Sequence, residues 1–175
     1  DRHPVTVTVD YPIGIGVALI GGHAAQATVP GGIVAVAALF VGLLAGIKVG
    51  IDRLDESFDR SIDKRTLPVV LGADRAERIA AGIFLLTAVA TVGVGLSGAA
   101  GVLAVSPALA VGAAAVPVAC LLATIRFAPE QAVRVHMTLT YAFAALLFLS
   151  VCDSQCAGLV VAERTLDAVG PATIG

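Results

Sequence analysis

The stretch from Gly31 to Gly72, GGIVAVAALFVGLLAGIKVGIDRLDESFDRSIDKRTLPVVLG, decides the fold. Its first twenty residues contain a single charge, Lys48, which stands near their end. A helix of about 20 apolar residues can cross the roughly 30 Å of hydrocarbon in a bilayer. From Ile51 onward the stretch carries four aspartates, one glutamate and four basic residues. It therefore predicts a membrane-spanning helix that ends in a dense charged segment.

The composition of the whole chain indicates a membrane protein. Of its 175 residues, 58% are hydrophobic and 14% are charged, whereas soluble domains carry about 25% charged residues. So few charges cannot cover a globule in water. We expect the lipid bilayer to surround the chain, and we expect no nucleic-acid partner.

Apolar segments recur along the chain and predict about five membrane spans. Each must be helical, because a strand or loop facing lipid would leave its backbone groups unpaired. The fourth contains Pro107 and Pro117, which we expect to kink it. The five segments are residues 11–28, 31–50, 79–96, 102–125 and 138–159. The predicted fold is an all-α, polytopic transmembrane helix bundle, with residues 1–175 as a single membrane domain.

The basic residues predict the orientation of this bundle. With alternating crossings, only Arg164 falls on the same side as the C-terminal end of the last span. The other ten lie opposite: Arg2, Lys48, Arg53, Arg60, Lys64, Arg65, Arg75, Arg78, Arg126 and Arg134. Cytoplasmic loops are enriched in Lys and Arg. The acidic loop 51–78 should therefore face the cytoplasm from the plasma membrane.

Three acidic residues of this loop follow a helical spacing. Asp52, Asp55 and Asp59 are three and then four residues apart, so they share one face if the second helix continues past Gly50. Carboxylates on one stripe repel each other unless a cation bridges them. Hard oxygen ligands suit Mg²⁺ or Mn²⁺. The spacing therefore indicates a divalent metal site at the membrane edge.

Basic residues accompany the carboxylates. Arg60, Lys64 and Arg65 are suited to bind phosphate oxygens, and Lys48 falls on the same helix stripe one turn earlier. Carboxylates, a divalent ion and basic residues at a membrane edge make a site for a lipid diphosphate. The alternative is an ordinary solvated loop in which charges of both signs are mixed.

The same segment resembles a known family. The pattern D-x-x-D-x-x-x-D from Asp52, followed by KRTLPVVLG up to Gly72, looks like the second aspartate-rich motif of the UbiA-type intramembrane prenyltransferases. The run Thr66-Leu67-Pro68-Val69 is its most specific part. The family has nine helices, three of them after this motif, and three apolar segments follow here. The resemblance thus covers essentially the whole chain as the C-terminal part of that fold.

The resemblance implies an enzyme and a site. Asp52, Asp55 and Asp59 would coordinate Mg²⁺ bridging to a prenyl diphosphate, with Asp55 and Asp59 as catalytic residues. Lys64 or Arg65 would contact the diphosphate. The reaction would transfer the prenyl group to an acceptor, which makes the enzyme a transferase of alkyl or aryl groups other than methyl.

The chain departs from the family pattern in two ways. The first aspartate-rich motif is missing, since residues 1–50 contain only Asp1 and Asp10 as acids. We therefore expect a C-terminal fragment of a longer enzyme that does not turn over alone. In addition, Asp63 stands where many members have glycine, which leaves the shape of the turn before Lys64 open.

Other polar residues carry weaker expectations. Asp153 should lie near the opposite membrane interface, where a charge costs less than at the bilayer centre. His23 and Gln26 predict a polar contact between helices. Arg126, Arg134 and His136 are expected in an ordinary basic loop. The cysteines at positions 120, 152 and 156 are expected to be small apolar fillers.

Two other functions remain open on the sequence. The first is a cation-coupled carrier that uses the acids as ion ligands, which would place ionisable groups near the bilayer midplane. The second is a truncated, non-catalytic relative that serves as a membrane scaffold.

Overall fold

The computed structural model describes residues 3–25 and 31–169, with side chains described as far as Cys152. Throughout these residues the regular elements are helices, which confirms the all-α prediction. Five of the helical segments are long and apolar enough to cross a membrane. The chain is therefore compatible with a membrane-embedded, multi-pass protein.

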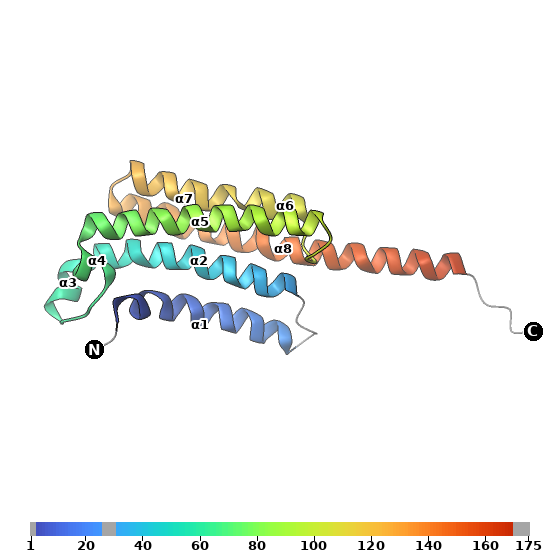
Figure 1. Cartoon of the computed structure of the whole chain (residues 1–175), viewed down its shortest axis with the longest axis horizontal. Helices are drawn as coiled ribbons and strands as arrows, with labels where there is room; N and C mark the ends of the chain where they lie inside the picture. Colours follow the sequence, from blue (N-terminus) through green and yellow to red (C-terminus); the bar gives the residue numbers. More distant parts are fainter. Residues whose placement is uncertain (1–2, 26–30, 170–175) are drawn as a thin grey trace, which may run out of the picture.

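Long helices lie side by side and run alternately in opposite directions (Figure 1). The two shortest helices gather at one end of the bundle, close to the N-terminus (Figure 1). In chain order the elements are α1 Pro4–Ala24, α2 Gly31–Leu54, α3 Glu56–Ser61, α4 Leu67–Leu71, α5 Ala73–Ala99, α6 Pro107–Ala113, α7 Ala115–Arg126 and α8 Pro129–Val169.

Helix α2 is the centre of the bundle, because it packs against α1, α5 and α8. Helices α6 and α7 close the bundle between α5 and α8. The core is apolar, and its largest fully buried side chains include Leu43, Ile47, Phe84, Phe143 and Leu147. Helix α1 packs chiefly on α2, so it lies at the edge of this core.

Small residues let the helices approach closely. A Cβ added to Gly46 of α2 would lie 2.7 Å from a ring carbon of Phe84 in α5. A Cβ added to Gly98 would lie 2.6 Å from the carbonyl oxygen of Val105. Membrane helices associate mainly through such close packing, since lipid tails are as apolar as the side chains.

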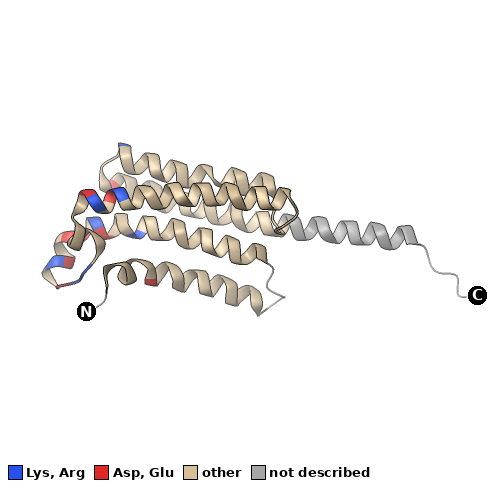
Figure 2. Cartoon of the chain, in the orientation of Figure 1, with Lys and Arg blue, Asp and Glu red and all other residues tan. Residues whose placement is uncertain are grey.

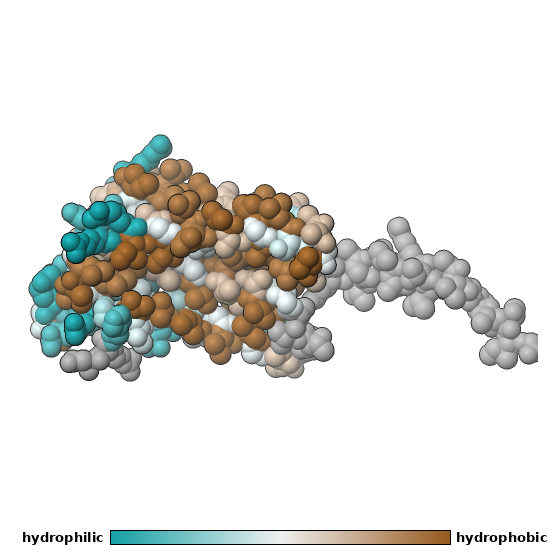
Figure 3. Space-filling model, in the orientation of Figure 1, coloured by the Kyte–Doolittle hydropathy of each residue, from teal (hydrophilic) through white to brown (hydrophobic). Residues whose placement is uncertain are grey.

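The outer surface of the bundle is apolar along its length. Figure 3 shows hydrophobic residues over the helices and hydrophilic ones gathered at one end. Leu86, Ile125 and Tyr141 expose 70%, 66% and 75% of their surface. Large exposed apolar faces are unusual on soluble monomers. This distribution matches the surface that a lipid-embedded bundle requires.

The predicted spans are correct in order but differ in their ends. Helix α1 begins at Pro4 rather than residue 11, with proline in its first turn and His3 accepting a hydrogen bond from the Val5 amide. Helix α5 begins at Ala73 rather than 79 because Gly72, with φ of 85°, separates it from α4 and the charged turn after it is helical. The first turns of α1 and α5 contain polar residues, so hydropathy alone predicts that both helices begin later.

Of the two prolines in the fourth span, Pro117 interrupts the helix as predicted and Pro107 does not. Pro107 starts α6 instead of kinking a longer helix. The break lies between α6 and α7, where α6 ends at Ala113 and α7 begins at Ala115. Pro117 lacks an N–H group, and its ring clashes with the carbonyl four residues earlier in a continuous helix. That carbonyl belongs to Ala113, so Pro117 accounts for the interruption.

Candidate functional site

Charged side chains collect at one end of the bundle, around α3 and α4 and the adjoining ends of α2 and α5 (Figure 2). The N-terminus, the segment 51–78 and the connection between α7 and α8 lie at this end (Figure 1). The sequence predicted that these three segments share one side, and the structure places them together. We call this part of the molecule the charged end.

Helix α2 continues past Gly50, where the predicted span ended, and ends at Leu54. Asp55 lies in the turn that follows, and α3 then starts at Glu56. Asp52, Asp55 and Asp59 therefore do not lie on one continuous helix as the shared stripe requires. Asp63 is exposed in a tight turn with φ of 55°. This left-handed conformation favours glycine and is tolerated by aspartate. It gives the shape of the turn that the sequence had left open.

Two of the predicted acids are buried and paired with lysines. Asp52 and Asp59 each expose only 1% of their surface. Lys48 forms an ion pair with Asp52 one helical turn away. The Lys64 ammonium lies 3.0 Å from Oδ1 of Asp59, and the Lys64 amide donates to the Asp59 carbonyl. The turn at Asp63 thus folds Lys64 back onto the carboxylate.

Each paired carboxylate keeps one oxygen without a partner. Oδ2 of Asp52 and Oδ2 of Asp59 are buried and accept no hydrogen bond from the described residues. Burying such an acceptor without a partner costs about 1–3 kcal/mol. These two oxygens are the natural positions for a further cationic or hydrogen-bonding ligand.

The negative charges of all three predicted metal ligands act on the Lys64 ammonium. Its hydrogen bond to Asp59, together with the negative charges of Asp59, Asp52 and Asp55, raises the pKa of Lys64 above its ordinary value despite partial burial. Lys64 is therefore a firmly charged ammonium at the charged end.

A cavity of about 440 Å³ lies beside the Lys48–Asp52 pair, between α1, α2 and α8. Its volume is in the range of small-molecule binding sites, which are mostly apolar with a few polar groups. The wall is lined by Tyr11, Ile15, Phe40, Leu44, Ile47, Lys48, Ile51, Met137, Thr140 and Tyr141. Lys48 is the cation of this wall, and its ammonium is paired with Asp52. The Lys48 side chain thus contacts both the apolar cavity and the buried Asp52 carboxylate.

The structure separates the other predicted diphosphate ligands from this cluster. Arg60 is exposed and pairs with Glu56, 2.8 Å away. Arg65 is exposed in the segment before α4. Of the four basic residues assigned to the diphosphate, Lys48 and Lys64 are the two that contact the buried carboxylates.

The three predicted metal ligands are not grouped around one position in the described structure. In the part of the chain that the structure describes, no three His, Cys, Asp or Glu side chains are grouped to share one metal. Asp55 is exposed at the start of α3. Mg²⁺ commonly binds through one or two carboxylates together with substrate phosphates. Asp52 and Asp59, each with an unpartnered buried oxygen, suit that role, and the metal itself stays a prediction.

His136 is a residue that the sequence placed wrongly. We expected it in a basic loop, but α8 begins at Pro129, so His136 lies within the helix and exposes only 2% of its surface. Its Nε2 atom lies 3.0 Å from the Cys120 carbonyl oxygen, and its ring packs 4.9 Å from Phe84. Pro129 at a helix start was the signal that could have placed it correctly.

The remaining expectations have mixed outcomes. Arg126 and Arg134 are exposed, as expected of loop or helix-end residues, and Cys120 is buried as expected of an apolar filler. Cys152 is exposed. Nε2 of His23 has no partner among the described residues, and the polar contact predicted for His23 and Gln26 stays a prediction. Arg2, Gln26 and the side chains of Asp153, Cys156 and Arg164 lie outside the described part.

Comparisons with family models, with curated proteins and with solved structures find no match for this chain. Its function must therefore be inferred from the buried acid–lysine pairs and the apolar cavity beside them.

Proposed function

We propose that this chain is the C-terminal part of a UbiA-type intramembrane prenyltransferase, which binds a prenyl diphosphate and transfers its prenyl group to an acceptor. The observation that carries the proposal is the position of Lys48. Its side chain lines the apolar cavity and pairs with Asp52 at the charged end. A ligand with a long apolar tail and an anionic head would match both features.

The cavity and the charged residues would bind different parts of the ligand. The cavity between α1, α2 and α8 would hold the prenyl tail, since its wall is almost entirely apolar. Lys48 and Lys64 would donate to the diphosphate, because ammonium groups form strong charge-assisted hydrogen bonds with phosphate oxygens. Mg²⁺ held by Asp52 and Asp59 would supply charge that stabilises the leaving diphosphate.

The proposed protein resides in the plasma membrane with its charged end in the cytoplasm. The basic residues support this orientation, since the described ones lie at the charged end (Figure 2) and cytoplasmic loops are enriched in Lys and Arg. A diphosphate in the cytoplasm would then reach the charged end of the bundle directly.

Charge placement favours this proposal over a cation-coupled carrier. Carriers typically place ion ligands near the bilayer midplane. In the described part of the chain, the acids and lysines are instead concentrated at one end of the bundle (Figure 2). A scaffold without ligand would not need two buried carboxylates beside a cavity.

Ligand binding tests the proposal directly. The chain would be reconstituted in nanodiscs and titrated with farnesyl thiolodiphosphate, an unreactive prenyl diphosphate analogue, in Mg²⁺ and in EDTA. We expect binding that requires Mg²⁺. Asp59→Asn should weaken it by about tenfold or more, since hydrogen bonds to charged groups contribute about 1.5–3 kcal/mol.

Asp74→Asn is the matched control, because Asp74 is an exposed carboxylate at the same end of the bundle. It should bind like the unmodified chain. Binding that is equally strong in EDTA, or equally weakened by both substitutions, would reject the proposed site. Absence of any binding would favour the scaffold, and ion-driven uptake into liposomes without diphosphate would favour the carrier.

A further inference from the structure

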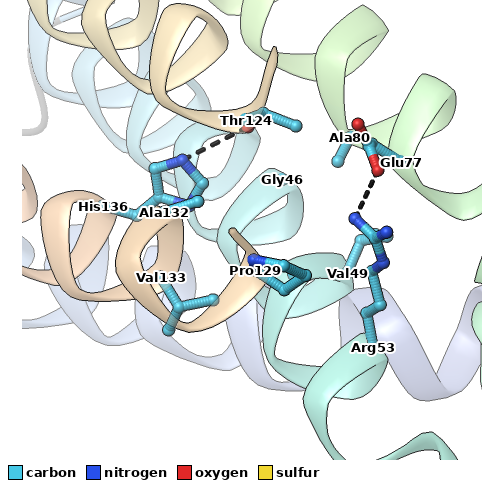
Figure 4. Close-up of a pocket in the computed structure, with 11 residues that line it drawn as sticks. Gly46, Val49, Arg53, Glu77, Ala80, Thr124, Pro129, Ala132, Val133 and His136 are labelled. Atoms are coloured by element: carbon cyan, nitrogen blue, oxygen red, sulfur yellow. Dashed lines mark hydrogen bonds and ion pairs between the residues drawn. The ribbon is translucent and has the colours of Figure 1, made fainter. Parts of the chain in front are cut away.

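The register between helices gives the depth of each residue that lines the large cavity beside Lys48. Helices α2 and α8 run in opposite directions (Figure 1). A Cβ added to Gly50 of α2 would lie 3.3 Å from Cγ2 of Val133 in α8, and Figure 4 shows Val133 close to this part of α2. Tyr141 lies about two turns further along α8. It is therefore about level with Leu44 of α2, and both residues line the cavity.

Helix α1 has its own close contact with α2, and the two helices also run in opposite directions (Figure 1). A Cβ added to Gly16 of α1 would lie 2.5 Å from Cγ2 of Val41 in α2. Tyr11 precedes this contact by more than one turn, so it is about level with Leu44 as well. Among the described residues of α1, the deepest one that lines the cavity is Ile15, next to the contact.

The cavity therefore has three levels along α2. Lys48 and Ile51 form the level nearest the charged end, Leu44 with the two tyrosines forms the middle, and Phe40 with Ile15 forms the inner end. From Lys48 to Leu44, and from Leu44 to Phe40, the helix advances by about 6 Å. Phe40 also packs against the buried core of the bundle, so neighbouring side chains hold its ring in place.

The length of the cavity matches a short isoprenoid tail. From the level of Ile51 to that of Phe40 the distance is about 16 Å, at the helical rise of about 1.5 Å per residue. An extended chain advances about 1.2 Å per covalent bond, and an isoprene unit has four bonds along its length. Three extended units thus cover about 15 Å and four cover about 20 Å.

We propose that the cavity accommodates a tail of three isoprene units and that Phe40 is the residue that sets this limit. The inference rests on the proposed function, since it places the head group of the ligand at Lys48. A fourth unit would meet the ring of Phe40 and would have to leave the cavity between α1 and α8, where Tyr11 and Tyr141 are exposed. It would then contact lipid instead of the protein and add nothing to binding.

A series of thiolodiphosphates with one, two, three and four isoprene units tests the limit. Their binding would be compared in nanodiscs with Mg²⁺, with each concentration expressed per lipid so that partition into the bilayer cancels. We expect the affinity to rise up to three units and not beyond. Phe40→Ala removes the ring, so the rise should continue to four units. Phe148→Ala is the matched control, because Phe148 is exposed on α8 outside the cavity, and its limit should stay at three.

A substitution at the middle level tests the same inference in the opposite direction. Leu44→Trp fills the space one turn above Phe40 and should lower the limit from three units to two. Leu149→Trp, at an exposed position of α8, is its control and should leave the limit unchanged. This variant keeps the test decisive even if Phe40→Ala does not fold.

The outcomes separate this inference from the proposed function. Mg²⁺-dependent binding that still strengthens with the fourth unit in the unmodified chain would overturn the limit and leave the proposed function standing. A limit that stays at three units in the cavity variants would overturn the role of Phe40 in the same way. If none of the four analogues binds, the proposed function is rejected and this inference with it.

Discussion

At the scale of single residues, the charged end depends on opposite charges buried together. Asp52 and Asp59 are almost completely buried, and each has one lysine as its ionic partner in the described structure. Removing one partner of such a pair leaves an uncompensated charge, which costs more than replacing both partners by apolar groups. The lysines are therefore part of the fold as well as candidate ligands.

Lys48→Met tests this dependence. The substitution keeps the apolar stem but leaves Asp52 without its ammonium partner, so we expect a loss of about 1–3 kcal/mol in the free energy of unfolding. The double variant Lys48→Met with Asp52→Leu should recover most of the loss. Unfolding in a denaturing detergent measures both. A single variant as stable as the unmodified chain would show that the pair contributes nothing to folding.

Lys64 predicts a dependence on alkaline pH. Its pKa is raised in the folded chain above the unfolded value of 10.5. Its contribution to stability is therefore complete below that value and is lost as the pH rises through the higher folded pKa. We expect the stability difference between the unmodified chain and Lys64→Gln to shrink across the alkaline window that opens above pH 10.5. A constant difference across this window would contradict the assignment.

The sequence identified part of this residue-scale picture. Lys48, Asp52, Asp59 and Lys64 were singled out by spacing and chemistry, and the structure brings them into two ion pairs. The sequence did not indicate which of the acids would be buried. Their burial depends on where α2 ends and on how α3 and α4 pack against it. His136 was missed for the same reason, since its surroundings come from α2, α5 and α7.

At the scale of elements, close helix packing depends on where glycine stands. Gly46 lies against Phe84, whereas Gly82 of α5 has open space around the position of a Cβ. Both are glycines in helices that are long and apolar enough to cross a membrane. They therefore separate the effect of packing from the effect of helix propensity.

Gly46→Ala should destabilise the bundle by about 1–3 kcal/mol, as expected for overpacking in a tight core. Gly82→Ala should be neutral or stabilise it by up to about 1 kcal/mol, because alanine favours helix. Midpoints of thermal unfolding for the two variants provide the comparison. Equal effects of the two substitutions would show that the α2–α5 contact is looser than described.

Hydropathy predicted the number, type and order of the long helices but not their ends. Charged residues in the first turn of α5 and the last turn of α2 belong to helices, although their hydropathy is that of a loop. The interruption before Pro117 could be expected from the missing N–H group. Whether it would be a kink or a full break depends on tertiary contacts that the chain does not encode locally.

At the scale of the whole molecule, charge and apolar surface are separated along the bundle axis. Figures 2 and 3 show charges at one end and hydrophobic residues along the sides. This separation was predictable from the basic residues and the apolar segments alone. The cavity was not, because one of its walls comes from α8, which is distant in the sequence from α1 and α2.

Labelling from either side of the membrane tests the orientation. In a variant without the native cysteines, Ser57→Cys marks the charged end and Ala100→Cys marks the opposite end, and both positions are exposed. We expect an impermeant maleimide to modify Ala100→Cys in intact cells and Ser57→Cys only in inverted vesicles. The reverse pattern would place the charged end outside the cell.

The edge position of α1 has a consequence for access. Helices α1 and α8 form two walls of the large cavity, yet in the described part of the chain each is held mainly by α2 and other neighbours rather than by the other. A seam between them can widen without disturbing the buried centre of the protein. We expect a long hydrocarbon ligand to enter the cavity laterally from the surrounding lipid, so that its tail does not pass through water.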